Sequence, residues 1–309
     1  MKKIIIIIVV GISILLAGCQ PIVSAGSSTI RVLAVETFLA DIVQNVSGER
    51  IQVESLIPLG LDPHAFEPTP QDVARIADSQ VLVVNGAGFE EWLQPVLTNT
   101  GGQHVVIEAS KGLTGRTERE GEEVEDAAHE HHDDGDPHFW LDPISVVKYV
   151  ENIRDGLAQA DPEGTKIYQA NAAAYILQLQ ELDRWVVEQV KSIPPEKRLL
   201  VTNHESLGYF ADRYGFKIAG TVIPSVSSDA SPSAQQLAHL VDQIGSVKAR
   251  AIFLETGSNP RLAEQVAGET GVKVVTDLYT HSVTAPGGPA PTYIEMIKAN
   301  VNAIVEALK

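Results

Sequence analysis

The feature that most constrains the fold of this chain is a repeated alternation of short apolar segments with segments of helical periodicity. The short segments are rich in Val, Ile and Leu at consecutive positions, which is typical of strands buried on both faces of a parallel sheet. Helices that alternate with such strands cover the two faces. The alternation runs through two blocks of the chain. It predicts an α/β fold with two lobes, each a mostly parallel sheet flanked by helices.

Each block supplies four expected strands. They lie at residues 30–36, 51–58, 81–86 and 104–109, and then at 198–203, 217–223, 251–256 and 272–277. Apolar residues at helical spacing predict helices at 38–46, 70–78, 89–97, 206–214, 233–245, 260–270 and 292–308.

One long helix is expected between the two blocks. Asp161 suits the N-cap and Pro162 the first turn, and neither Gly nor Pro occurs from residue 165 to residue 193. About thirty helical residues make a rod of roughly 45 Å. Such a rod is either a surface helix of one domain or a rigid spine joining both lobes, and we favour the spine. The expected division is an N-terminal lobe at 29–160, the linking helix at 161–193 and a C-terminal lobe at 194–309.

The N-terminus has the form of a secretory signal. Lys2 and Lys3 precede an apolar stretch at residues 4–16, which is too short to span a bilayer comfortably. The stretch ends in Leu-Ala-Gly-Cys and resembles a bacterial lipoprotein signal, in which the cysteine is lipidated. We therefore expect a signal peptide at 1–18, an acyl anchor on Cys19 and a tether at 19–28. The protein would then be extracytoplasmic and anchored to a membrane. The alternative is a plain secretory peptide with an incidental cysteine.

Charge and cysteine content exclude several kinds of partner. The formal net charge of −17 disfavours nucleic acid and anionic membrane surfaces, and suits a cation as ligand. Cys19 is the only cysteine, so the chain can form no internal disulfide and no thiolate metal site.

Potential metal ligands follow the expected strands, where α/β folds place their ligand sites. His64 and His138 belong to the first block, and His204 and Asp277 to the second. Three imidazoles and one carboxylate make a complete tetrahedral set for Zn²⁺ and also suit Mn²⁺. The four residues therefore predict a divalent-metal site between the lobes.

The triplet Asp-Pro-His occurs twice, at residues 62–64 and 136–138. Proline fixes its own φ and restricts the preceding residue, so the histidine leaves a stiff turn. The aspartate can accept the second ring N–H, an arrangement that is common around metal-bound histidine.

Several segments resemble the metal-binding lipoproteins of bacterial ABC importers for zinc and manganese. The most specific are "LDPHAFEPTPQD", "DPHFWLDP", "TNHESLGYF", "VSSDASPSAQQLAHL", "AIFLETGSNPRLAEQVAGETGVKV" and "PTYIEMIKANVNAI". The resemblance covers nearly the whole chain after the tether. It implies two α/β lobes joined by one long helix, an ABC permease as partner, and ligands at His64, His138, His204 and Asp277. We also expect the protein to be a monomer.

The resemblance also bears on the identity of the metal. Manganese members often carry a carboxylate where this chain has His204, and imidazole suits Zn²⁺. Zinc members often have an acidic, histidine-bearing loop before the second ligand motif. Here residues 118–135 form such a segment, with His129, His131 and His132 among acidic residues. This loop either collects zinc weakly or has no measurable role. We expect zinc as the cargo, with manganese as the alternative.

The remaining candidates receive structural interpretations. His281 follows Asp277 closely and is a minor candidate for the cleft wall, whereas His104 and His239 are expected to be structural. Glu67 and Glu205 are candidates for alternative or supporting carboxylates. The three tryptophans, Trp92, Trp140 and Trp185, are expected in the core or at interfaces.

Two other functions are alternatives to metal capture. A zinc hydrolase would use three histidines with Glu67 or Glu205 as base, and would need an open coordination position. The chain has no His-Glu-x-x-His motif, and four protein ligands would saturate the ion, so no enzymatic activity is expected. A surface adhesin is the other alternative, and no sequence feature tests it.

Overall fold

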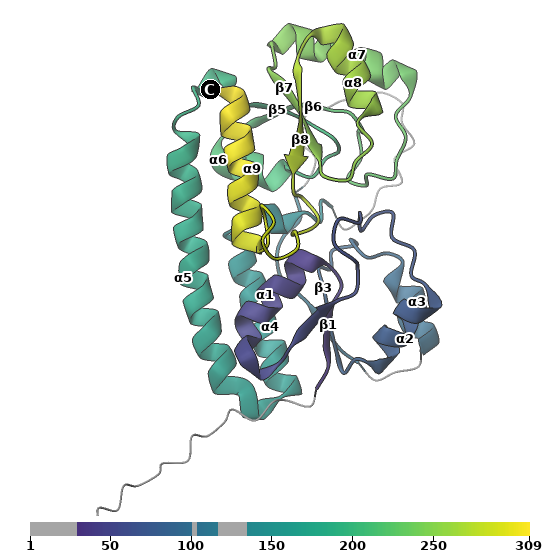
Figure 1. Cartoon of the computed structure of the whole chain (residues 1–309), viewed down its shortest axis with the longest axis vertical. Helices are drawn as coiled ribbons and strands as arrows, with labels where there is room; N and C mark the ends of the chain where they lie inside the picture. Colours follow the sequence, from purple (N-terminus) through teal and green to yellow (C-terminus); the bar gives the residue numbers. More distant parts are fainter. Residues whose placement is uncertain (1–29, 101–103, 117–134) are drawn as a thin grey trace, which may run out of the picture.

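The molecule consists of two α/β lobes. The computed structural model describes residues 30–100, 104–116 and 135–309. Within them, each lobe contains a four-stranded sheet, in the order β2-β1-β3-β4 or β6-β5-β7-β8. The described strand pairs are all parallel. Figure 1 shows the lobes stacked along the long axis, with α5 beside both. The predicted fold class is confirmed.

The elements follow the predicted alternation. The first lobe contains β1 (Val32–Ala34), α1 (Thr37–Ser47), β2 (Val53–Ser55), α2 (Pro70–Asp78), β3 (Val81–Val84), α3 (Leu93–Thr100), β4 (Val105–Glu108) and α4 (Ser145–Ala160). The helix α5 (Thr165–Val190) follows. The second lobe contains β5 (Leu199–Thr202), α6 (Gly208–Tyr214), β6 (Lys217–Thr221), α7 (Ala234–Val247), β7 (Ala251–Glu255), α8 (Arg261–Thr270), β8 (Lys273–Leu278) and α9 (Tyr293–Leu308).

Local chemistry explains which helices the sequence predicts well. Helix α2 has the predicted bounds because Thr69 and Asp72 form a reciprocal capping box and Pro70 opens the first turn. Helix α4 was not predicted, and its N-cap residue, Ile144, provides no side-chain cap. Its signal is the spacing of its buried residues, which are Val146, Tyr149, Val150, Ile153 and Leu157.

Helix α5 begins later than predicted. The carboxylate of Asp161 does not cap it, because Arg50 Nη2 and the Tyr168 hydroxyl donate hydrogen bonds to that carboxylate at 2.8 and 2.5 Å. A 3₁₀ turn, Pro162–Gly164, precedes the helix. The 26 residues of α5 span about 39 Å. The helix packs against α1 and α4 of the first lobe and α6 and α9 of the second. The exact domain boundaries stay a prediction.

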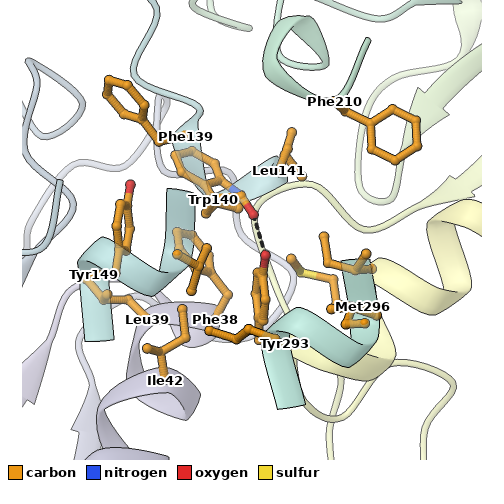
Figure 2. Packing of buried hydrophobic residues seen from close by; sticks show 14 of the residues in the cluster. Phe38, Leu39, Ile42, Phe139, Trp140, Leu141, Tyr149, Phe210, Tyr293 and Met296 are labelled. Atoms are coloured by element: carbon orange, nitrogen blue, oxygen red, sulfur yellow. Dashed lines mark hydrogen bonds between the residues drawn. The ribbon is translucent and has the colours of Figure 1, made fainter. Parts of the chain in front are cut away.

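The two lobes share an apolar core around Trp140 (Figure 2). The Trp140 ring stacks on Phe38 with a centroid distance of 4.6 Å, and the Tyr293 hydroxyl donates a 2.7 Å hydrogen bond to the Trp140 carbonyl. Because Phe38 follows β1 and Tyr293 begins α9, this cluster joins elements from both ends of the chain. Trp140 is buried, Trp185 packs partly buried against the same cluster, and Trp92 packs against Phe66. The structural expectation for the tryptophans is confirmed.

Some predictions concern parts of the chain outside the described residues. These are the signal peptide, Cys19, the tether, and the loop histidines His129, His131 and His132. Among the described residues, no helix combines the length and the apolar character needed to cross a bilayer.

Candidate metal centre

Four histidines from four separate loops meet between the lobes. His64 lies between β2 and α2, and His138 precedes the 3₁₀ turn Phe139–Leu141. His204 follows β5, and His281 follows β8. One ring nitrogen from each lies within 4.8 Å of the other three. The structure therefore brings together the three predicted histidines, and a fourth, His281, that the sequence marked only as a minor candidate.

The spacing of the nitrogens fits a tetrahedral ion. His138 Nε2 lies 3.3 Å from His64 Nε2 and 3.3 Å from His204 Nε2. With Zn–N bonds of about 2.0–2.1 Å, two nitrogens on one edge of a tetrahedron are about 3.3–3.4 Å apart. His281 Nε2 is buried without a hydrogen-bond partner in the described part of the chain, as expected for a nitrogen kept free for an ion. The four imidazoles form a candidate donor set.

Burial keeps most of these imidazoles neutral. Burial, together with the neighbouring histidines, holds the pKa of His64 and His138 well below the usual value, and burial also lowers the pKa of His281. Burial acts to lower the pKa of His204 too, but the charge and hydrogen bonding of Glu255 outweigh it and raise that pKa. Because only a deprotonated imidazole nitrogen binds a metal, three of the four rings need lose no proton at neutral pH.

Asp136 orients His138 as the Asp-Pro-His motif predicts. Its Oδ1 accepts the His138 main-chain N–H at 3.0 Å and lies 2.8 Å from the ring Nδ1. Arg116 Nη1 lies 3.6 Å from Asp136 Oδ2. A side chain at Gly208 would collide with Arg116, since an added Cβ would lie 1.9 Å from Nη1. The contact between Asp136 and His138 Nδ1 therefore leaves His138 Nε2 directed toward the other rings.

The first copy of the motif works differently. Asp62 Oδ1 accepts the main-chain N–H of His64 at 3.0 Å, and Asp62 Oδ2 accepts the Ser228 hydroxyl of the second lobe at 2.5 Å. The His64 ring instead packs edge-on against Phe89, with centroids 4.9 Å apart. Asp62 thus fixes the loop and ties it to the second lobe, while Phe89 supports the ring.

Sequence reasoning missed Glu255, which adjoins two of the rings. Its Oε1 lies 2.7 Å from His204 Nδ1, and its Oε2 lies 3.6 Å from His281 Nδ1. Burial acts to raise the pKa of Glu255, but the charges of His204 and His281 outweigh it and lower that pKa to about 2. The available signal was position, because Glu255 is the last residue of β7 and ligand sites lie at the carboxyl ends of parallel strands.

The placement predicted for Asp277 is corrected by the structure. Its side chain is exposed and lies outside the histidine cluster. The strand β8 continues to Leu278, and its pairing with β7 shifts register between the Phe253–Val275 and Glu255–Leu278 pairs. This irregularity turns Asp277 toward solvent, and the chain reaches the cleft only at His281.

The other candidates lie away from the centre. Glu67 and His239 are exposed, and Glu205 is not part of the cluster. His104 Nδ1 lies 2.9 Å from the Ser79 carbonyl, in keeping with a structural role. A cavity of about 30 Å³, large enough for a water molecule, is lined by Asp62, Glu255 and His281. It lies beside the histidine cluster.

Four imidazoles enclosed between two parallel-sheet lobes, three of them kept neutral by burial, define a class: a two-lobed binding protein for a divalent metal ion. A family model described as zinc-uptake complex component A, periplasmic, matches residues 32–307. The chain belongs to that family.

Individual relatives agree with this assignment. A manganese-binding lipoprotein of Halalkalibacterium halodurans is 36% identical over 305 residues, with 97% of each chain covered. A metal ABC transporter substrate-binding lipoprotein of Streptococcus parasanguinis is 28% identical and covers 100% of this chain and 99% of its own. The solved periplasmic zinc-binding protein of Treponema pallidum matches with a TM-score of 0.80 at 26% identity, over 91% of this chain and 99% of its own.

These findings confirm the predicted family and its general role. The chain is the extracytoplasmic metal-binding component of an ABC metal importer, and it is not an enzyme. The relatives are named for different metals, so the identity of the ion is a separate question.

Proposed function

We propose that this protein captures Zn²⁺ between its lobes and delivers it to the permease of an ABC importer. The ion is held by His64, His138, His204 and His281. The observation that carries the proposal is the convergence of four buried or partly buried imidazoles at the nitrogen spacing of a tetrahedral zinc site. Four protein ligands leave no coordination position for a substrate water, which suits transport.

The donor set favours zinc over manganese. Imidazole nitrogen suits Zn²⁺, whereas Mn²⁺ prefers oxygen ligands and higher coordination numbers. With His281 in the cluster in place of Asp277, the set contains no oxygen donor. The site as described is therefore less suited to manganese than the three-histidine, one-carboxylate set that the sequence predicted.

Manganese capture is the second candidate. The observation that favours it is the 36% identity with the manganese-binding lipoprotein of Halalkalibacterium halodurans over nearly the whole chain. Surface adhesion has no supporting observation among the described residues. We further propose that the protein acts as a monomer attached to the membrane through Cys19.

The loop histidines His129, His131 and His132 are proposed to collect zinc weakly.

Metal competition and metal content together test the zinc proposal. Purified protein titrated with Zn²⁺ and Mn²⁺ in competition should bind one equivalent of zinc more than about tenfold tighter than manganese. A nitrogen-rich site binds zinc tightly in vitro whatever the cell supplies, so the metal content of protein isolated from its native cells is the second measurement. Zinc should predominate there. Predominant manganese in the cellular sample would establish the second candidate instead.

A further inference from the structure

Among the described residues, Glu255 is the buried carboxylate that faces two rings of the histidine cluster. Its exposed fraction is 5%, and both carboxylate oxygens point toward ring nitrogens, Oε1 toward His204 Nδ1 and Oε2 toward His281 Nδ1. The Ser206 hydroxyl donates a 3.1 Å hydrogen bond to Oε1. That bond fixes the position of the carboxylate.

The two nitrogens of a metal-binding imidazole must differ in protonation: one binds the metal without a proton, and the other carries the proton. A ring that binds metal through Nε2 must carry its proton on Nδ1, and a carboxylate beside Nδ1 favours that tautomer. At 2.7 Å, Glu255 Oε1 is within hydrogen-bond distance of His204 Nδ1. At 3.6 Å, Oε2 acts on His281 Nδ1 through its charge. The Thr280 hydroxyl lies 3.1 Å from the same nitrogen and can accept a hydrogen bond from its N–H.

Charge balance gives an independent argument. Four neutral imidazoles leave the charge of a buried divalent cation uncompensated, which is costly in a medium of low dielectric constant. Asp136, the carboxylate beside His138, already faces Arg116. In the described part of the chain, Glu255 has no Lys or Arg within ion-pair distance, so its negative charge is available to the ion.

We infer that Glu255 is a positioning residue that sets the tautomers of both His204 and His281 and balances the charge of the bound ion. The inference rests on the proposed function, because it takes the cluster as the ion's site. It assigns Glu255 no direct bond to the metal. One side chain at the end of β7 thereby sets the tautomers of two histidines that lie in two different loops.

The test combines the isosteric variant Glu255→Gln with zinc titration. Glutamine keeps the size of the side chain but loses its charge and places an NH₂ group where an acceptor is needed. Zinc affinity should fall about 10–100-fold, the range typical for partners of metal-bound histidine. Ser206→Ala should cause a smaller loss in the same direction. The control is Glu264→Gln on the exposed face of α8, which should bind zinc like the unmodified protein.

A double-mutant cycle separates positioning from a structural effect. If Glu255 acts through the two rings as well as through its charge, Glu255→Gln should reduce zinc affinity clearly less in a His204→Ala, His281→Ala background than in the unmodified protein. An equal loss in both backgrounds would overturn the inference. Thermal unfolding of each metal-free variant shows whether it is folded.

A second readout does not depend on zinc as the cargo. Long-range ¹H–¹⁵N NMR of the metal-free protein reports the tautomer of each histidine ring. His204 and His281 should carry their protons on Nδ1 in the unmodified protein, and the Glu255→Gln variant should lose that preference at His204. Unchanged tautomers would contradict the inference even if zinc binds. Failure of the unmodified protein to bind zinc would instead contradict the proposed function.

Discussion

At the scale of single residues, the four histidine rings reach the cluster from different kinds of local structure. His64, His138 and His204 follow motifs whose local geometry is fixed by proline or by the end of a strand. The apolar run before Asp277 favours that carboxylate as the fourth ligand, yet its side chain is exposed beside a register shift in β8, and His281 lies in the cluster instead. Strand pairing determines such a shift, and pairing depends on contacts with β7 that a one-dimensional pattern does not contain.

The pair His281 and Asp277 offers a matched test at this scale. His281→Ala should weaken zinc binding by at least about tenfold, because it removes one nitrogen of the buried set. Asp277→Ala should leave zinc affinity within about twofold, because its side chain is exposed and outside the cluster. Isothermal titration or competition with a chelating dye measures both. A large loss of zinc affinity in Asp277→Ala with little change in His281→Ala would show that Asp277, not His281, is the fourth ligand.

At the scale of elements, capping and strand ends were predictable but long-range ion pairs were not. The bounds of α2 follow from a capping box within four residues. The late start of α5 follows from Arg50, which is distant in the sequence and draws Asp161 away from the cap. The β1–α1 junction holds a second feature that the sequence pattern does not predict, a buried carboxyl group. Glu36 there is fully buried, and its carboxylate oxygens have no hydrogen-bond donor among the described residues.

Glu36 and Glu90 predict a dependence of stability on pH. Burial and the charge of Glu90 raise the pKa of Glu36 well above its usual value, and burial raises that of Glu90 to about 7. A carboxyl whose pKa is raised by folding stabilises the protein below its unfolded-state pKa, and this contribution is lost as pH rises through the folded-state pKa. The metal-free protein should therefore lose stability between about pH 5 and about pH 8.

The variant Glu36→Gln isolates this effect from other titrating groups, such as Asp41 and Asp136. It removes one acid of the pair and supplies an amide donor for Glu90. At about pH 8 it should raise the free energy of unfolding by on the order of 1 kcal/mol relative to the unmodified protein, with a smaller difference at about pH 5. Urea denaturation at several pH values measures this difference. If the free energies of unfolding of the two proteins change in parallel with pH, the Glu36–Glu90 pair does not take up a proton in this pH range.

At the scale of the whole molecule, the alternation of strands and helices was sufficient to predict two parallel-sheet lobes and the long helix beside them. The shared core around Trp140 was not predictable in that way, because Phe38 and Tyr293 meet there from opposite ends of the chain (Figure 2). The site depends on this assembly. His64 and His138 come from one lobe, and His204 and His281 from the chain of the other, so the four nitrogens meet only when both lobes are in place.

X-ray absorption at the zinc edge of the fully loaded protein tests this central claim most directly. With one equivalent of bound zinc, the account predicts four nitrogen ligands at about 2.0–2.1 Å and the multiple-scattering pattern of four imidazoles. His281→Ala should reduce the imidazole count by one, whereas Asp277→Ala should leave the spectrum unchanged. A spectrum with fewer than four imidazoles in the unmodified protein, or with a carboxylate oxygen that disappears in Asp277→Ala, would contradict the four-histidine site.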